Sequence, residues 1–198
     1  MKLIVITAEH FFDKEPEAIN RLFENGMEVL HVRKPRAPVG RVIHLMERID
    51  AVFHPRIVVP NYELTSLFAV KGIHLSRRDL DLWQPGRTGR RLSLSCSCHS
   101  FEEIAAAVVD YMFLSPIFDS ISKAGYKQGY TPEQLIDARD RHLINDRVIA
   151  LGGITAERIP AVCRYGFGGV AVLGALWADG NTDGLLQRFD ELKTACSI

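Results

Sequence analysis

Short apolar runs alternate with amphipathic stretches along this chain. The runs are rich in Val, Ile and Leu and end at Gly, Pro or charged residues. This pattern is typical of strands that are buried on both faces of a parallel sheet. It predicts strands at residues 3–7, 29–33, 56–59, 73–75, 92–97, 111–114, 148–151 and 169–173.

The segments between these runs have the periodicity and end signals of helices. The clearest stripe lies in residues 42–53, where apolar side chains recur at helical spacing. Ser100 followed by Glu103 fits a capping box at the start of another helix. Helices are predicted at residues 16–25, 42–53, 63–70, 101–109, 131–141, 155–165 and 182–195, with a single turn at 79–83.

Strands that alternate with helices predict right-handed crossovers and a parallel sheet. Eight such units favour a single (β/α)8 TIM barrel that occupies residues 1–198 as one domain. The chain is short for a barrel, which typically has ~250 residues, so helices and loops must be minimal. An open, flavodoxin-like sheet with fewer strands is the alternative.

Composition narrows the classes of partner. Lys+Arg and Asp+Glu both number 24, so net charge does not favour a nucleic-acid binder. No apolar run approaches the ~20 residues that span a bilayer. The apolar start of the chain is interrupted by Glu9, His10 and Asp13, which favours a first strand over a signal peptide. We therefore expect neither nucleic acid nor membrane as partners, and a homo-oligomer is left open. Phosphorylated small-molecule substrates are expected from the residues described below.

The four cysteines indicate the compartment. They are Cys96, Cys98, Cys163 and Cys196, and none belongs to a C-x-x-C pair. Buried thiols in a reducing cytoplasm are the expected interpretation.

Residues 148–176 predict a phosphate site. An apolar strand runs into Gly152 and Gly153, and the next strand ends at Gly174. Glycine has no Cβ, so backbone N–H groups at such turns can approach an anion closely. In (β/α)8 barrels the loops after strands seven and eight often bind phosphate. A plain tight turn is the alternative interpretation.

Other candidate side chains follow the remaining predicted strands, because barrel enzymes carry their chemistry at the C-terminal strand ends. Cations and small hydrogen-bonding groups dominate, which suits a ligand with two phosphate-type groups. Asp79 and Asn61 carry the oxygen donors that Mg²⁺ prefers. The candidates are His31, Arg33, Asn61, His74, Asp79, Ser97, His99, Ser120, Ser122 and Lys123.

Each candidate also has a structural interpretation. Asp79 could be a helix cap, and His74, inside a strand, is expected to be a packed, hydrogen-bonded histidine. Arg33 and Lys34 could belong to a solvated basic loop, and Lys123 likewise.

Six segments in this order resemble thiamine phosphate synthase and the related TenI-like thiazole tautomerases. They are LHVRKP (30–35), GIHLSRRDL (72–80), SCSCHSFEE (95–103), DYMFLSPIFDSISK (110–123), ALGGI (150–154) and GVAVLGAL (169–176). Each segment alone is weak, but together they cover nearly the whole chain. The resemblance implies a (β/α)8 barrel that couples a hydroxymethylpyrimidine diphosphate with a thiazole phosphate, giving thiamine phosphate and pyrophosphate.

The resemblance also implies residue roles. Arg33 and Lys123 would contact the diphosphate, and Asp79, with Asn61 as a second donor, would bind Mg²⁺. Ser97, Ser120 and Ser122, with His31 and His99, would contact phosphate oxygens or neighbouring substrate groups. The thiazole phosphate would lie on backbone N–H groups of Gly152, Gly153, Leu173 and Gly174.

The sequence departs from both family patterns. The synthase pattern Gln-x-Arg-x-Lys is here His31, Arg33 and Pro35, and Lys34 or Arg36 is out of register with the missing lysine. Pro60-Asn61 replaces Asn-Asp, and Pro116 stands where the tautomerase pattern has a histidine. There are two alternatives to a synthase. One is a tautomerase that uses His31 or His99 instead, and the other is a non-catalytic protein that binds thiazole phosphate or thiamine phosphate.

Overall fold

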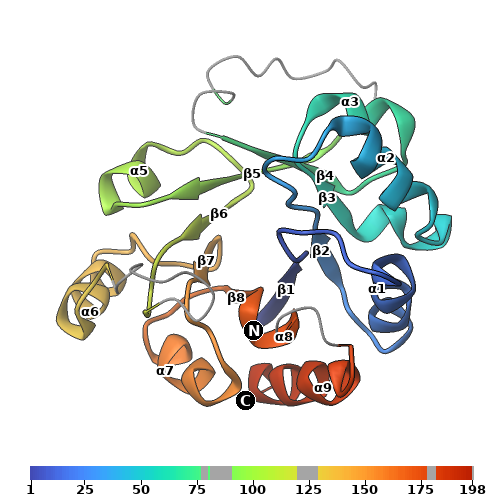
Figure 1. The fold of residues 1–198 in the computed structure, drawn as a ribbon. Coiled ribbons are helices and arrows are strands. Elements are labelled where there is room, and N and C mark those ends of the chain that lie inside the picture. Colours follow the sequence, from blue (N-terminus) through green and yellow to red (C-terminus); the bar gives the residue numbers. More distant parts are fainter. Residues whose placement is uncertain (77–79, 81–90, 120–128, 178–181, 198) are drawn as a thin grey trace.

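Eight parallel strands close into a barrel in the computed structural model, in the order in which they occur along the chain (Figure 1). The structure describes residues 1–76, 80, 91–119, 129–177 and 182–197. The strands are β1 (Lys2–Ile6), β2 (Val29–His31), β3 (Ile57–Val59), β4 (Gly72–Leu75), β5 (Ser93–Cys98), β6 (Tyr111–Leu114), β7 (Val148–Leu151) and β8 (Gly169–Val172). β1 pairs with both β2 and β8, which closes the ring. The predicted (β/α)8 barrel is confirmed, and the open-sheet alternative is wrong.

Helices surround the strands on the outside of the ring (Figure 1). They are α1 (Glu15–Glu24), α2 (Val39–Glu47), α3 (Tyr62–Leu67), α5 (Phe101–Ala106), α6 (Pro132–Asp140), α7 (Ile159–Arg164), α8 (Gly174–Trp177) and α9 (Leu185–Cys196). Short 3-10 helices cover Ala51–Arg56 and Ala156–Arg158. The predicted turn at residues 79–83 lies, apart from residue 80, outside the described residues.

The predicted helix at residues 42–53 is two elements. α2 ends at Glu47, and a 3-10 helix follows it. Asn20 of α1 contacts the backbone at the break, where its side chain donates to the Arg48 carbonyl (3.4 Å) and accepts from the Asp50 N–H (3.0 Å). Those backbone groups are then no longer available for regular helical bonds. Pro55 also removes one donor from the second element.

The helices in the last third of the chain also differ from the predicted ones. The predicted helix at 155–165 begins as a 3-10 turn, and the regular helix α7 starts at Ile159, with Pro160 in its first turn. α8 was not predicted, because GALW reads as the end of an apolar run. α9 begins at Leu185, after Gly184 with φ of 69°, and not at residue 182.

Two apolar clusters fill the molecule. The larger packs the outer strand faces against the helices, and includes Leu22, Met46, Val59 and Phe189. A smaller cluster inside the barrel joins Ile4, Ile6, Phe113, Ile149 and Ala171. A layer of polar side chains also lies inside the barrel, and it borders the candidate site.

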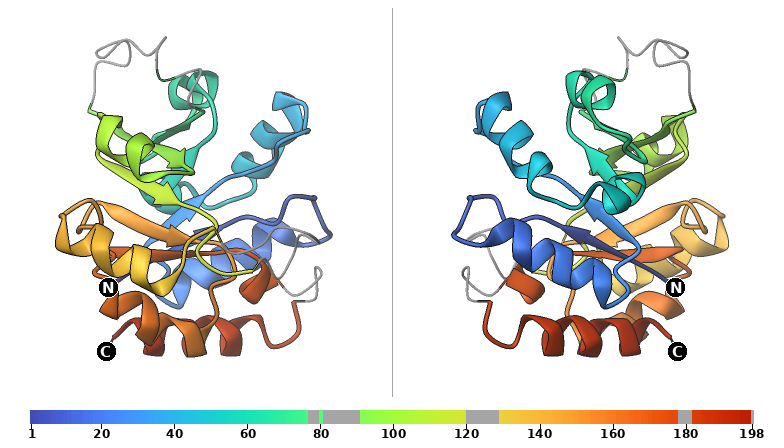
Figure 2. Two further views of the ribbon diagram at one scale, coloured as in Figure 1. Left: turned by 90° about the vertical axis from the view of Figure 1, so that its left-hand side faces the viewer. Right: turned by 90° about the vertical axis from the view of Figure 1, so that its right-hand side faces the viewer.

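The two ends of the described chain meet. Figure 2 shows N and C at the same edge, and the Met1 ammonium donates to the Cys196 carbonyl at 2.7 Å. α9 therefore covers the side of the barrel where β1 and β8 join. Among the described helices, none combines the length and apolar character that crossing a bilayer requires.

Candidate active site

A pocket of about 290 Å³ opens at the C-terminal ends of the strands. Residues from β1, β2, β5, β6, β7 and β8, or from the loops after them, line it. The pocket brings together seven of the sequence-predicted site residues: Arg33, Ser97, His99, Gly152, Gly153, Leu173 and Gly174. The fold therefore gathers the candidates where a barrel enzyme carries its chemistry.

The turn after β7 forms one wall of the pocket. Gly152 and Gly153 have φ of 101° and 62°. A Cβ on Gly153 would lie 2.3 Å from the Asp119 carbonyl oxygen, and one on Gly152 would lie 2.9 Å from the Cα of Pro116. Both the backbone conformation and the close loop after β6 thus require glycine here.

The turn after β8 continues this wall. α8 begins at Gly174, directly after Leu173. The first N–H groups of a helix have no partner within the helix, and Gly174 and Ala175 line the pocket. Two adjacent turns therefore present backbone to one space, as a phosphate site requires.

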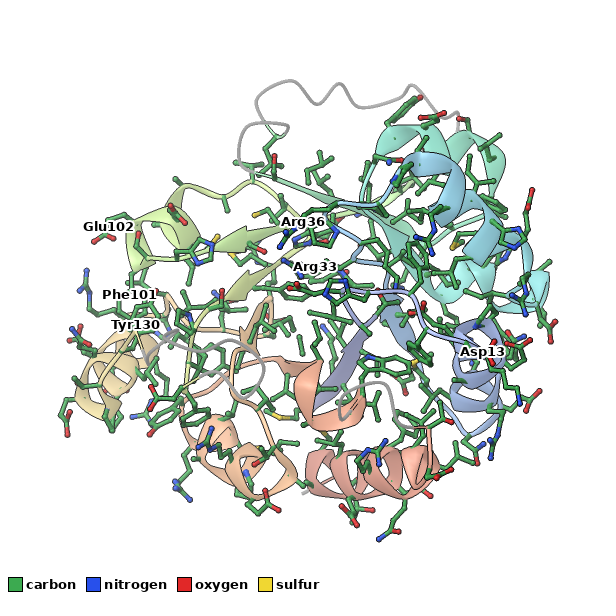
Figure 3. The ribbon with its side chains drawn as sticks, in the orientation of Figure 1. Asp13, Arg33, Arg36, Phe101, Glu102 and Tyr130 are labelled. Atoms are coloured by element: carbon green, nitrogen blue, oxygen red, sulfur yellow. The ribbon has the colours of Figure 1, made fainter. Side chains whose placement is uncertain are left out.

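Arg33 supplies the positive charge. Its backbone is fixed by Thr7, whose hydroxyl accepts from the Arg33 N–H (2.9 Å) and lies 3.2 Å from the Arg33 carbonyl oxygen, to which it donates. Its Nη1 is 2.5 Å from Oε1 of Glu9, and the Arg33 side chain is 42% exposed. In Figure 3, seen as in Figure 1, Arg33 and Arg36 project over the middle of the ring, whereas Asp13 lies at its periphery.

Lys34 points away from the pocket. Its Nζ is fully buried and lies 2.7 Å from Oε1 of Glu15. It also donates to the carbonyls of Ala8 (2.8 Å) and His10 (3.0 Å). Burial lowers the pKa of Lys34, and burial raises the pKa of Glu15 although the ion pair opposes both shifts. Lys34 therefore cannot replace the lysine that is missing at Pro35.

Ser97 forms part of the pocket floor, above His74. Nε2 of His74 is 3.1 Å from Oγ of Ser97, and Nδ1 is 3.0 Å from Oγ of Ser95. Burial, and then the charge of Arg33, lower the pKa of His74 to about 4. His74 is thus a neutral, hydrogen-bonded histidine, as expected from the sequence, and it orients a side chain that lines the pocket.

His31 lies deeper inside the barrel, where it is 3% exposed. Its Nε2 is 2.6 Å from the Tyr111 hydroxyl, and its ring packs on those of His74 and Phe113. Burial lowers the pKa of His31 well below its usual value, and burial raises that of Tyr111 to about 12. His31 is not among the residues that line the pocket. The structure therefore gives no support for its predicted contact with substrate.

His99 is exposed and lines the pocket. Its Nδ1 is 3.0 Å from the Ser115 carbonyl oxygen, which can only accept, so Nδ1 carries a hydrogen. In the neutral ring, Nε2 then holds the lone pair. The backbone of His99 is fixed by Glu103, which accepts from its N–H (2.6 Å), and by Tyr130, which donates to its carbonyl (2.6 Å).

Of the two predicted metal ligands, Asn61 belongs to the described residues. Oδ1 of Asn61 accepts from the Leu64 N–H at 3.3 Å and caps α3. Asp79 lies outside the described residues, as do Ser120, Ser122 and Lys123. In the part of the chain that the structure describes, no three His, Cys, Asp or Glu side chains gather as a metal ion would require.

Sequence reasoning missed Glu9, Ser115 and Thr7. Glu9 and Ser115 line the pocket, and Thr7 holds Arg33. The rule used for the other strands would have found all three, because each follows directly, or within three residues, the end of β1 or β6.

Known proteins are similar to this chain over most of its length. The family model described as thiamine monophosphate synthase matches residues 3–176. The thiamine-phosphate synthase of Cronobacter sakazakii is 30% identical over 186 residues, which are 89% of this chain and 87% of that protein. That of Levilactobacillus brevis is 31% identical over 168 residues, 79% of this chain and 75% of that protein.

A solved structure agrees with these matches. The crystal structure of thiamine phosphate pyrophosphorylase from Bacteroides thetaiotaomicron is 36% identical, with a TM-score of 0.85. It covers 100% of this chain, which in turn covers 98% of it.

Proposed function

Because this chain belongs to the thiamine monophosphate synthase family, we propose that it couples hydroxymethylpyrimidine diphosphate with thiazole phosphate, giving thiamine phosphate and pyrophosphate. The observation that carries the proposal is a single pocket lined by Arg33, Ser97 and the glycine turns after β7 and β8. One cationic side chain and one backbone phosphate site suit two phosphorylated substrates.

Each part of the pocket has a role in this proposal. Arg33 binds the diphosphate of the pyrimidine substrate. Backbone N–H groups around Gly152, Gly153 and Gly174 bind the thiazole phosphate. Ser97 and His99 contact substrate groups between these ends.

The chemistry is a dissociative substitution. The C–O bond to the diphosphate breaks, and the electron pair leaves with that oxygen. The resulting pyrimidine-stabilised cation is attacked by the lone pair of the thiazole nitrogen, which forms the new C–N bond. Arg33 stabilises the charge that develops on the leaving group, and the step needs no strong base.

Magnesium dependence is part of the proposal and rests on the family. Asp79 would be a ligand, and Lys123, Ser120 and Ser122 would contact phosphate oxygens. Asn61 would be the second donor, since its Oδ1, which caps α3, keeps a second lone pair. The described residues do not form a metal site by themselves, so no step is assigned to the ion.

One observation favours a second candidate, the thiazole tautomerase. His99 lines the pocket with the lone pair on Nε2, so it can accept a proton from a bound ligand. It would then replace the histidine whose position Pro116 occupies.

Location in the cytoplasm is proposed with the same function. None of the four cysteines forms a disulfide, as expected in a reducing compartment.

Turnover by the purified protein separates the candidates. With both substrates and Mg²⁺, we expect thiamine phosphate and pyrophosphate in equal amounts, detected by chromatography, and little product with a chelator. Arg33→Gln is expected to lower kcat/KM by about 10²-fold, because it removes a charged contact to the leaving group. Arg48→Gln, which changes an exposed arginine paired with Glu17, is the matched control.

Two results would contradict the synthase. The first is isomerisation of a thiazole carboxylate phosphate without metal, abolished by His99→Gln, and no coupling of the two substrates. The second is binding of thiazole phosphate with neither coupling nor isomerisation, which would indicate a binding protein.

A further inference from the structure

Glu9 places a carboxylate in a pocket that otherwise suits anions. It follows β1 and lines the same cavity as Arg33. Oε1 of Glu9 is 2.5 Å from Nη1 of Arg33, and the two side chains are 25% and 42% exposed. An anionic ligand that reaches Arg33 therefore meets a negative charge that already occupies one of its donors.

The position of Glu9 is fixed by its surroundings. Nζ of Lys34 donates to the carbonyls of Ala8 and His10, the residues on either side of Glu9. Glu15 balances the Lys34 charge through both carboxylate oxygens, at 2.7 and 2.9 Å. The segment around Glu9 is therefore held at two points. Lys34 binds the backbone on either side of Glu9, and Arg33 binds the Glu9 side chain.

Arg33 is also anchored. Its backbone N–H and carbonyl both bond to the hydroxyl of Thr7, which is fully buried. The Glu9–Arg33 ion pair therefore links the segment after β1 to the segment after β2. The backbone of each segment is fixed, and both side chains reach the pocket. Only the side chains need to move when a ligand enters.

We propose that Glu9 is an internal counter-ion that competes with the anionic substrate for Arg33. When the diphosphate binds, Arg33 exchanges the Glu9 carboxylate for a phosphate oxygen. When pyrophosphate leaves, Glu9 recovers Arg33, which weakens product binding. The inference rests on the proposed function in one respect, that Arg33 meets the diphosphate.

Titration calorimetry with inorganic pyrophosphate tests the competition directly. Glu9→Gln keeps the shape of the side chain and removes its charge. We expect pyrophosphate to bind this variant about three- to tenfold more tightly than the wild type, because one close like charge and one competitor are lost. Glu17→Gln, which breaks an exposed Glu–Arg pair of 2.7 Å outside the pocket, should leave the affinity unchanged.

A double-mutant cycle identifies the route. If Glu9 acts through Arg33, Glu9→Gln should give no tighter binding in an Arg33→Gln background. Unchanged or weaker binding by Glu9→Gln, with a thermal melt like that of the wild type, would overturn the inference. So would a gain that persists without Arg33.

These outcomes are separable from those of the proposed function. If Arg33→Gln abolishes coupling but Glu9→Gln does not tighten pyrophosphate binding, the inference fails and the synthase stands. If Glu9→Gln tightens binding but the protein forms no thiamine phosphate, the synthase fails and the counter-ion stands.

Discussion

Arg33 and Lys34 are consecutive cations with opposite environments. Arg33 lines the pocket, whereas the Lys34 ammonium is completely buried against Glu15. Both residues follow the end of β2, so neighbouring positions of one loop have opposite surroundings. A buried ion pair loses hydration on both partners, and the opposite pKa shifts of Glu15 and Lys34 express that cost. The pair holds the loop after β1, so its value lies in position more than in stability.

Changing one partner of this pair should be worse than changing both. Lys34→Met leaves Glu15 buried without its counter-charge, so we expect the free energy of unfolding to fall by about 3–5 kcal/mol. Lys34→Met combined with Glu15→Leu should recover much of that loss, since no charge remains buried. Urea unfolding followed by circular dichroism measures both. Equal losses in the single and double variants would contradict the explanation, and Arg48→Met provides an exposed control.

The strand-to-helix turns determine the geometry of the site at the scale of elements. Two glycines with positive φ follow β7, and the loop after β6 packs directly on them. The N–H of Phe118 donates to the Gly152 carbonyl at 3.1 Å, and Arg158 donates to the Gly153 carbonyl at 2.7 Å. The wall of the pocket is thus supported from both sides.

Gly153→Ala should disturb both stability and binding. Its Cβ would lie 2.3 Å from the Asp119 carbonyl oxygen, and the residue has φ of 62°. We expect a loss of about 1–3 kcal/mol in the free energy of unfolding, with weaker binding of inorganic phosphate by calorimetry. Gly40→Ala, in α2 with nothing within 4 Å of its Cβ, should be neutral or slightly stabilising. Unaltered phosphate affinity in Gly153→Ala would remove this turn from the site.

At the scale of the whole molecule, the barrel interior combines apolar residues with a polar layer. His31, His74, Ser95 and Tyr111 lie there, where TIM barrels usually carry branched aliphatic residues. Every buried side-chain nitrogen and oxygen among the described residues has a hydrogen-bond partner. These polar side chains can therefore stay buried in the barrel as long as His31 and His74 are neutral.

This arrangement predicts acid sensitivity. The pKa of His74 is about 4 in the fold and 6.5 for an ordinary histidine, so the unfolded chain binds the proton more readily. Its contribution to stability, about 3 kcal/mol from the size of the pKa shift, is present above pH 6.5 and is lost as the pH falls towards 4. Equilibrium unfolding at a series of pH values should show this slope. It should be reduced in His74→Gln and unchanged in His44→Gln, which alters an exposed histidine. An equal slope in all three proteins would refute the assignment.

The sequence predicted strands better than helices. All eight strands are present, with ends displaced by at most two residues, because buried parallel strands are distinct apolar runs. The prediction of one helix at 42–53 was wrong: α2 ends at Glu47, and Asn20, distant in sequence, binds the backbone of Arg48 and Asp50 just beyond it. α8 failed because four apolar residues carry no periodicity. Helix ends depend on such tertiary contacts, whereas the number of strands does not.

The sequence by itself determined the barrel and the glycine turns, because strand periodicity and the conformational freedom of glycine are local properties. It also placed Arg33, Ser97 and His99 at strand ends, and the closed ring then gathered them into one pocket. Only the tertiary structure decided that Lys34 is buried, that His31 lies beneath the site and that Glu9 faces Arg33. Burial and charge pairing join residues from different strands, and a single chain segment does not record which side chains will meet.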